Sequence, residues 1–226
     1  MVEKAKIESV KIQIHEGRIA FFRGHTAAYR TNRDGTEDRG TAAKPKKPKY
    51  GWTWLLDPTN AQAAKTILEI KKEAARLMDH RYDGRANWPK ANEATGMGAP
   101  IFCFGDGNKL PKVYDGFKDM FYVKASDTTR PLLGSRRGLS VRLVDADGQF
   151  HVILKDGTVT DQVVNADEVP YAGSYCRGSI TMYSYDNLAC GINANAISAQ
   201  FIRAGADDRG QQLRVPAGID AVAVKC

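Results

Sequence analysis

The sequence lacks any long hydrophobic run. Its longest uncharged apolar stretches fall far short of the roughly 18 residues that a membrane-spanning helix needs. The N-terminus also carries charged residues where a signal peptide would have its apolar core. We therefore expect an intracellular location and no membrane partner.

Cysteine is scarce, and its spacing matches no known scaffold. The four cysteines are Cys103, Cys176, Cys190 and Cys226. They form no CxxC pair, which argues against both a zinc ribbon and a disulfide framework. We expect reduced thiols.

Sequence motifs for nucleotide binding and catalysis are missing as well. Neither GxGxxG nor GxxxxGK[ST] occurs, so the simplest dinucleotide and nucleoside triphosphate sites are excluded. The histidines are scattered, at His15, His25, His80 and His151. The sequence therefore predicts no metal, no cofactor and no catalytic residue. Carboxylates that only the fold brings together leave a nuclease or another enzyme open as an alternative.

Positively charged residues outnumber negatively charged ones. The 226 residues include 33 Lys and Arg against 26 Asp and Glu, a net charge of +7. Residues 1–50 carry 12 basic and 6 acidic residues, whereas residues 151–226 carry 6 and 8. A basic excess favours a polyanionic partner. The length and the 42% hydrophobic content are typical of one folded unit, and we expect residues 1–226 to form a single domain.

Hydrophobic periodicity predicts mainly β structure around one helix. Residues 7–22 contain two β-prone stretches with a turn at Gly17, and residues 50–56 form a strand with Tyr50, Trp52, Trp54 and Leu56 on one face. Asp57 and Pro58 are typical of an N-cap and first helical position, and the helical spacing after them predicts an amphipathic helix over 58–79. Further strands are expected near 101–104 and at 118–126, 139–144, 150–155, 174–185 and 192–203, with turns at DADG and KDGT.

Two segments are expected to be loops. Residues 24–48 are basic and polar, ending in AAKPKKPK, and form either a solvated linker or a flexible arm that contacts DNA through Lys46 and Lys47. Residues 83–117 form a long loop, in which Trp88 either stacks on a base or anchors the loop. Strands, then one helix, then more strands indicate a mainly β fold, a small β-barrel with one inserted helix and long loops.

The strand at 174–185 has two unlike faces. Cys176, Gly178, Ile180 and Met182 are small and apolar, which suits a barrel interior. The opposite, exposed face carries Tyr175, Arg177, Ser179, Thr181, Tyr183 and Tyr185. Tyrosine rings can stack on bases while arginine neutralises phosphates, so this face is a candidate surface for binding single-stranded nucleic acid. The alternative is that a loop or the helix covers it.

Weaker candidates lie in the preceding segment. Tyr122 and Lys124 share one face of the strand at 118–126, and either face of that strand could be core. Arg130, Arg136 and Arg137 in the loop SDTTRPLLGSRRG form a possible phosphate clamp. Trp52 and Trp54 are expected in the core.

These residues resemble a known family. YAGSYCRGSITMYSYDN (171–187) and CGINANAISAQFIRAG (190–205) resemble the C-terminal signature of phage single-stranded DNA-binding proteins with an OB fold, and KDMFYVKASDTTRPLL resembles that family's central strand and Arg-Pro loop. The family is more distantly similar to the T7-type replication protein. The resemblance implies a non-catalytic OB-fold barrel that binds single-stranded DNA with little sequence preference during DNA replication, recombination or repair, in the cytoplasm of an infected bacterial host.

One departure concerns partners. Residues 203–226 hold three acids and four bases, not the acidic tail that recruits replication proteins. A C-terminal tail from about residue 206 could instead mediate self-association, as a homodimer or along DNA. A strand-annealing recombination mediator and a structural protein remain alternative functions.

Overall fold

The computed structural model describes residues 8–32, 34–90, 99–111, 114–144, 148–186 and 189–205. Over these residues the fold is mainly β with one α-helix, as the sequence predicts. Most strands form one 11-stranded sheet, and two short strands form a separate ribbon. The elements are β1 (Lys11–Ala28), β2 (Gly40–Thr41), β3 (Lys44–Pro45), β4 (Lys49–Leu56), α1 (Ala61–Tyr82), β5 (Ile101–Phe102), β6 (Phe104–Asp106), β7 (Phe121–Asp127), β8 (Leu132–Gly134), β9 (Ser140–Val144), β10 (Gln149–Ile153), β11 (Val159–Val164), β12 (Tyr175–Asp186) and β13 (Cys190–Arg203).

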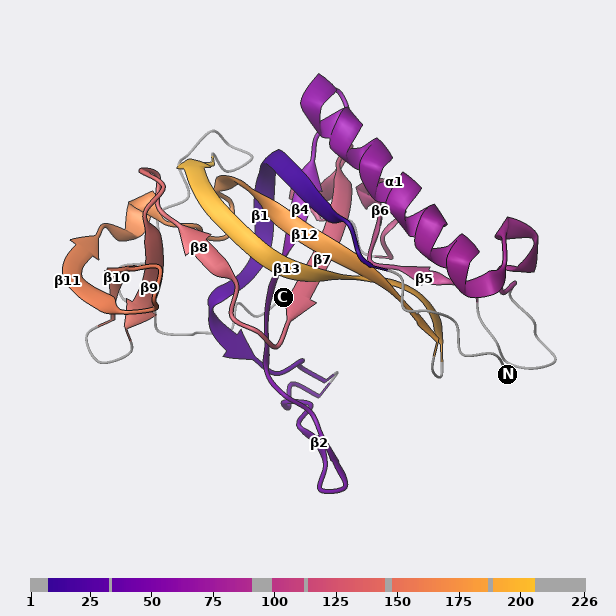
Figure 1. The fold of residues 1–226 in the computed structure, drawn as a ribbon, viewed down its shortest axis with the longest axis horizontal. Coiled ribbons are helices and arrows are strands. Elements are labelled where there is room, and N and C mark those ends of the chain that lie inside the picture. The colour runs from indigo at the N-terminus through magenta and orange to yellow at the C-terminus, as the bar shows by residue number, and fades with distance from the viewer. Residues whose placement is uncertain are drawn as a thin grey trace.

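The central strands curve around a single core. The main sheet runs β11-β10-β9-β8-β13-β12-β1-β4-β7-β6, and β5 pairs with β13 (Figure 1). Cys103 lies between β5 and β6, where its N–H donates to Ile192 O of β13 at 2.9 Å and its carbonyl accepts from Lys124 N of β7 at 2.7 Å. Among the described strands, the paired strands follow an open order and do not form a closed ring. The predicted barrel is therefore not confirmed.

β1 is one bent strand. The predicted turn at Gly17 is wrong: β1 pairs first with β12 and then with β4, and its register with β12 shifts between Ile14 and Gly17. One extra residue in β1 makes this a β-bulge, which bends the strand without ending it. A side chain at Gly17 would approach the Leu56 side chain to 2.9 Å, so glycine allows the bend to lie against the core.

The predicted helix exists but begins and ends about three residues later. Asn60, not Asp57, is the N-cap, since its side chain accepts from two backbone N–H groups of the first turn. Asp57 Oδ1 instead accepts from the backbone N–H of Thr59 at 2.9 Å, which holds the preceding turn. Asp83 ends the helix in the left-handed conformation, with φ of 57°.

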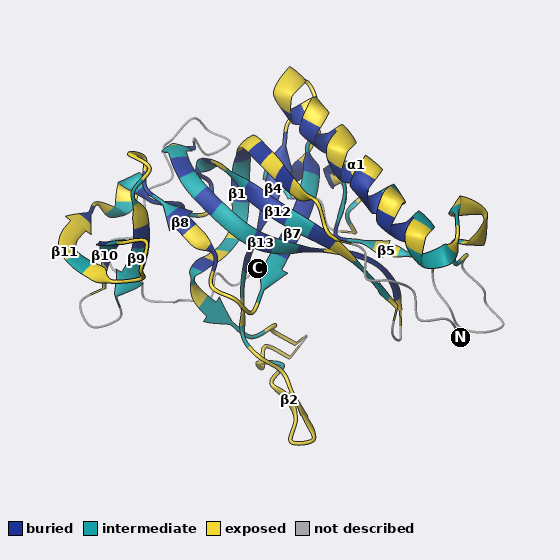
Figure 2. Ribbon diagram, viewed as in Figure 1, coloured by how far each residue is buried: buried dark blue, intermediate teal, exposed yellow. Residues whose placement is uncertain are grey.

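The helix packs through one side only. Figure 2 shows a continuous buried stripe on the side of α1 that faces the sheet and exposed residues on the other side. Ile70 and Met78 in this stripe are fully buried. Thr66 Oγ1 donates to Gln13 O at 3.5 Å, and Val10 N donates to Glu73 Oε1 at 3.2 Å, so the helix lies along the first half of β1.

The two tryptophans of β4 lie in the core as predicted, with 3% exposure for Trp52 and 0% for Trp54. Burial is not limited to one face, because β4 is buried on both sides from Gly51 to Leu56. Trp88 anchors its loop: Nε1 donates to Asp79 Oδ1 of the helix at 2.9 Å, and its ring lies 6.4 Å from that of Phe102. Within the expected long loop, the predicted strand near 101–104 is present as β5 and β6.

β8 to β11 extend the sheet on one side of the molecule (Figure 1). β9 and β10 match predicted strands, whereas the sequence analysis missed β8 and β11. The KDGT turn joins β10 to β11, and three residues of the DADG turn lie outside the described part of the chain.

The basic segment 24–48 is partly structured. β1 continues to Ala28, and β2 pairs with β3 in a ribbon that projects from the body of the protein and is exposed (Figures 1 and 2). The expected C-terminal tail from residue 206 lies outside the described residues.

Candidate functional site

One row of directly opposed residues crosses five strands of the sheet; four of the five reach the surface, and Leu55 is buried, with 2% exposure. The register places Arg18 of β1 opposite both Leu55 of β4 and Tyr175 of β12. Leu55 lies opposite Tyr122 of β7, and Tyr175 lies opposite Arg203 of β13. Directly opposed residues share a face. We call these five residues the cross-sheet row; with strands about 4.8 Å apart, it is about 19 Å long.

The alternation along β12 puts this face outside. Cys176, Ile180 and Met182 are fully buried, whereas Arg177 and Tyr183 are exposed and Tyr175 is half-buried, as the sequence predicts. Gly178 is less buried than the rest of its predicted face. Sequence reasoning had also placed Ser179 on the exposed face, but it is 1% exposed. Its hydroxyl lies 2.8 Å from that of Ser198 on β13.

Two arginines flank Tyr175 in the cross-sheet row. The guanidinium carbon of Arg203 lies 3.5 Å from the Tyr175 ring centroid, and Arg203 Nη2 donates to Glu16 Oε1 at 2.7 Å. Arg18 lies on the other side of Tyr175, on β1. Tyrosine rings with guanidinium groups beside them form the kind of surface on which unpaired bases stack while their phosphates are neutralised.

An aromatic cluster extends the row at its Tyr122 end. The ring of Phe21 lies 5.4 Å from Tyr114 and 5.8 Å from Phe117, and Phe117 lies 6.3 Å from Tyr122. Phe21 is 48% exposed. Lys124 Nζ lies 5.3 Å from the Tyr122 ring. Burial raises the pKa of the Tyr122 phenol. This cluster therefore combines exposed aromatic surface with a cation.

Sequence reasoning missed Phe21 and Tyr114. A signal for Phe21 was present, because adjacent residues of a regular strand point to opposite sides. In the structure Phe21 lies at a register shift between β1 and β4, with φ of 51°. Phe22 packs partly buried against the core, which leaves Phe21 outside. Tyr114 could not be placed, because its position depends on a loop of irregular structure.

Arg177 lies next to the row along β12. Its Nε donates to Gln200 Oε1 at 2.9 Å, and Gln200 Nε2 donates to Ser135 O at 3.2 Å. This chain links Arg177 to the loop that carries Arg136 and Arg137. Both arginines of that loop are exposed, and Arg137 Nη2 lies 3.7 Å from Glu168. The structure thus brings three predicted arginines to one side of the row.

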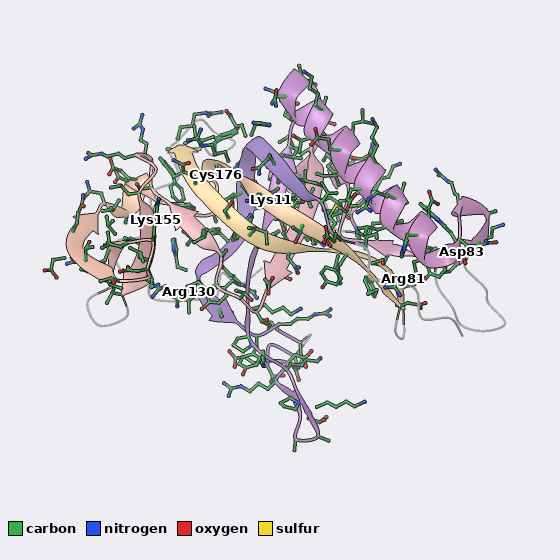
Figure 3. All side chains as sticks on the ribbon, in the orientation of Figure 1. Lys11, Arg81, Asp83, Arg130, Lys155 and Cys176 are labelled. Carbon is green, nitrogen blue, oxygen red and sulfur yellow. The ribbon has the colours of Figure 1, made fainter. Side chains whose placement is uncertain are left out.

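Tyr183 and Tyr185 are not brought to the row. They lie eight and ten residues from Tyr175 on β12, and eight residues span about 26 Å of strand. Beside them, Arg81 of the helix donates to Ser184 Oγ and O at 2.8 Å each. Figure 3 shows Arg81 near the β12–β13 turn, far from Cys176, which is next to Tyr175 in the chain.

The remaining predicted residues lie elsewhere. Arg130 Nε donates to the Tyr50 hydroxyl at 3.1 Å, and its guanidinium lies over the Tyr50 ring. Lys46 on the ribbon segment pairs with Asp38 at 2.5 Å, whereas Lys47 is exposed. Arg130 and Lys46 are both exposed, so these contacts leave their charges at the surface.

In the described part of the chain, the requirements of a metal site, a disulfide or a membrane-spanning helix are not met. No group of three His, Cys, Asp or Glu side chains that could hold a metal ion occurs there. Cys103, Cys176 and Cys190 are free and buried, and burial raises the pKa of the first two to about 12. Among the described helices none is long and apolar enough to cross a membrane.

Comparison with known proteins gives one family. Residues 37–213 match the family model described as Enterobacter phage Enc34, ssDNA-binding protein. Protein p50 of Acyrthosiphon pisum secondary endosymbiont phage 1 is 30% identical over 104 residues, which are 46% of this chain. That match spans 44% of the length of p50.

Two solved structures of one phage protein share the fold of this chain. The single-stranded DNA-binding protein from bacteriophage Enc34 in complex with ssDNA is 16% identical, with 95% of this chain and 97% of that chain covered and a TM-score of 0.55. The same protein alone gives 16% identity, 91% coverage of each chain and a TM-score of 0.56. A more distant match is gp2.5, a single-stranded DNA-binding protein encoded by bacteriophage T7, with 12% identity, coverage of 91% and 97%, and a TM-score of 0.44.

Proposed function

Because the chain belongs to the family of the Enterobacter phage Enc34 ssDNA-binding protein, we propose that it binds single-stranded DNA along the cross-sheet row and the aromatic cluster beside it. The family is one of DNA-binding proteins, so the chain is a binder and not an enzyme. The observation that carries the proposed site is the register: it aligns Tyr122, Arg18 and Tyr175 on one outer face although they come from three different strands.

The chemistry of this face suits DNA of any sequence. Each base offers a π-face, so stacking on Tyr122 and Tyr175 needs no particular base, and each stacked base contributes about 1–3 kcal/mol. Arg18 and Arg203 lie between and beside these rings, where they can neutralise phosphates. The face therefore combines non-specific stacking with an electrostatic attraction that salt weakens.

Outlying cations extend the proposed contact area. Arg177, Arg136 and Arg137 lie on one side of the row, and Lys47 lies on the exposed ribbon segment. Positive groups around a stacking surface hold the backbone without reading sequence. We include these residues as phosphate contacts and leave Tyr183 and Tyr185 outside the main path.

The central strands are proposed to form an OB-type barrel within a single domain. The support is Cys103, whose two backbone hydrogen bonds join β13 to β7 across the open side of the curved sheet. OB folds use curved, outward-facing strands and adjacent loops to hold oligonucleotides. The position of the row on β1, β4 and β7 agrees with that use.

We propose that the binding protects single strands during phage DNA replication, recombination or repair in the bacterial cytoplasm. Self-association along DNA is part of this proposal. The edge strand β11 supports it, because Val159 and Val163 are 41% and 48% exposed and an unpaired strand edge can pair with another chain. Sedimentation with and without oligo-dT tests this point, and a monomer under both conditions would contradict it.

The main test is a fluorescence-polarisation titration of labelled oligo-dT and an equal-length duplex at several salt concentrations. We expect preference for the single strand, and about tenfold weaker binding or more for Tyr122→Ala and for Tyr175→Ala. Tyr183→Ala is the matched control, since it removes an exposed tyrosine from the same face of β12 at a distance from the row. Equal losses in all three variants would move the site off the row.

A further inference from the structure

A groove lined by both polar and apolar residues lies next to the cross-sheet row on the same side of β12 and β13. It has a volume of about 460 Å³, and its walls come from four strands, β1, β12, β13 and β8, with Ser140 at the start of β9 on its rim. Its lining includes Gln13, Leu132, Ser140, Arg177, Ser198 and Gln200.

The register explains why these side chains meet. Gln13 of β1 lies opposite Ser179 of β12, which lies opposite Ser198 of β13, and Ser198 lies opposite Leu132 of β8. These residues form a second row across the sheet, parallel to the first. Ser179 lies four positions after Tyr175 on β12, a distance of about 13 Å, which a few nucleotides of extended strand can span.

Arg177 and Gln200 form the boundary between the two rows. Gln200 uses Oε1 to accept from Arg177 and Nε2 to donate to Ser135 O, so its amide is fixed at both ends. Gly134 lies opposite Gln200, and a side chain there would approach Gln200 Cγ to 3.0 Å. The missing side chain leaves Gln200 room to hold the Arg177 guanidinium at the entrance of the groove.

The groove lining can satisfy the edge of a base. The Gln13 side chain is exposed and can both donate and accept hydrogen bonds. Ser198 lines the groove, and its hydroxyl lies 2.8 Å from that of the buried Ser179 and keeps further hydrogen-bonding capacity. Leu132 is 67% exposed and offers an apolar surface to the face of a ring.

We propose that this groove is a nucleobase subsite, which takes one unstacked base of the strand that runs along the cross-sheet row while Arg177 contacts the adjoining phosphate. The inference rests on the proposed single-stranded DNA binding and extends it. Donors and acceptors are both present, so the subsite accepts different bases and adds affinity with little base preference.

The experiment fills the groove and measures how affinity depends on oligonucleotide length. Ser140→Trp places a large side chain at the rim from an exposed position, and Gln13→Ala removes a lining amide with little risk to folding. Gln162→Trp is the matched control, because Gln162 is exposed on β11 outside the groove. Oligo-dT of increasing length is titrated against each protein by fluorescence polarisation.

For the wild type, affinity rises with length until every subsite is filled. We expect Ser140→Trp to reach its plateau at a shorter length and to bind the longest oligo-dT about tenfold more weakly, the effect of one lost base contact. Gln13→Ala is expected to weaken binding in the same length range, and Gln162→Trp to match the wild type.

The two proposals fail in different ways. If Ser140→Trp and Gln13→Ala keep the wild-type length dependence and affinity, the groove is not a base subsite, and single-stranded DNA binding on the row stands. If the wild type binds no oligo-dT of any length, the proposed function is wrong and the subsite falls with it.

Discussion

The guanidinium carbon of Arg203 lies 3.5 Å from the ring centroid of Tyr175, and Arg203 is held there by Glu16 at 2.7 Å. Arg203 therefore covers one face of a ring that is proposed to stack on DNA. A planar guanidinium can itself stack on a base, so the pair extends the stacking surface instead of blocking it. Glu16 places a negative charge next to the proposed phosphate path.

Glu16→Gln is expected to strengthen binding of oligo-dT by about two- to fivefold, because it removes a repulsive charge and releases Arg203 from an exposed ion pair. The titration is done at low salt, where exposed charges are least screened. Glu69→Gln removes the same charge from the exposed side of α1 and is expected to have a smaller effect. A weaker-binding Glu16→Gln protein would show that Glu16 positions Arg203 for binding.

Lys47→Gln is expected to reduce the slope of log affinity against log salt by about 0.7, the contribution of one phosphate contact to a single strand. Lys46→Gln is the matched comparison on the same segment. Lys46 already pairs with Asp38 at 2.5 Å, so its removal should change the slope less. Equal slopes for both variants and the wild type would exclude the ribbon segment from the DNA path.

His25 makes stability depend on pH. Its ring is enclosed by Phe22 and Phe150 and bonds to Pro170 O at 2.8 Å; burial lowers its pKa from 6.5 to about 4. Between these values the unfolded chain binds a proton that the folded chain excludes, so folding is fully favoured above pH 6.5 and loses stability as pH falls toward 4. The loss is at most about 3 kcal/mol.

Urea unfolding at pH 7.5, 6 and 5 measures this effect. His25→Phe is the control, because a phenyl ring cannot take up a proton. We expect the stability difference between wild type and His25→Phe to shift in favour of the variant as pH falls. A difference that is constant with pH would mean that His25 does not titrate in this range.

Gly191→Ala is expected to destabilise the protein by about 1–3 kcal/mol, since a side chain at this position would collide with the backbone carbonyl of Ile101. The β5–β13 pairing and the neighbouring Cys103 link to Ile192 would be strained together. Thermal unfolding measures the change. Gly148→Asn is the control: its φ of 68° suits asparagine and the space around it is open, so a change within about 0.5 kcal/mol is expected.

Local patterns were sufficient for β12, β13 and the helix. The alternation in β12 and the helical spacing after residue 60 are strong because each repeats over many residues. They failed where two local signals compete. Asp57 and Asn60 are both good caps, and only packing decides between them; Gly17 fits both a turn and a bulge.

The candidate site was only partly predictable for a related reason. Alternation in single strands identified Tyr175 as outward-facing and left either face of the Tyr122 strand as core, and nothing local aligns one strand with another. Leu55 and Arg18 lie in the row because β4 pairs with both β1 and β7 in this register. Tyr183 lies outside the row because it is far from Tyr175 along β12. Cross-strand register depends on contacts between distant parts of the chain, which a reading of single segments does not contain.

β1 also sets the order in which the protein can be assembled. The first half of β1 pairs with β12, so Arg18 can pair with Tyr175 only after β12 has been synthesised. Until then this half of the strand has an unpaired edge, and such long-range pairing makes folding slow. A translating ribosome would therefore carry a nascent chain in which β1 stays open to association with other chains until the β12–β13 hairpin emerges.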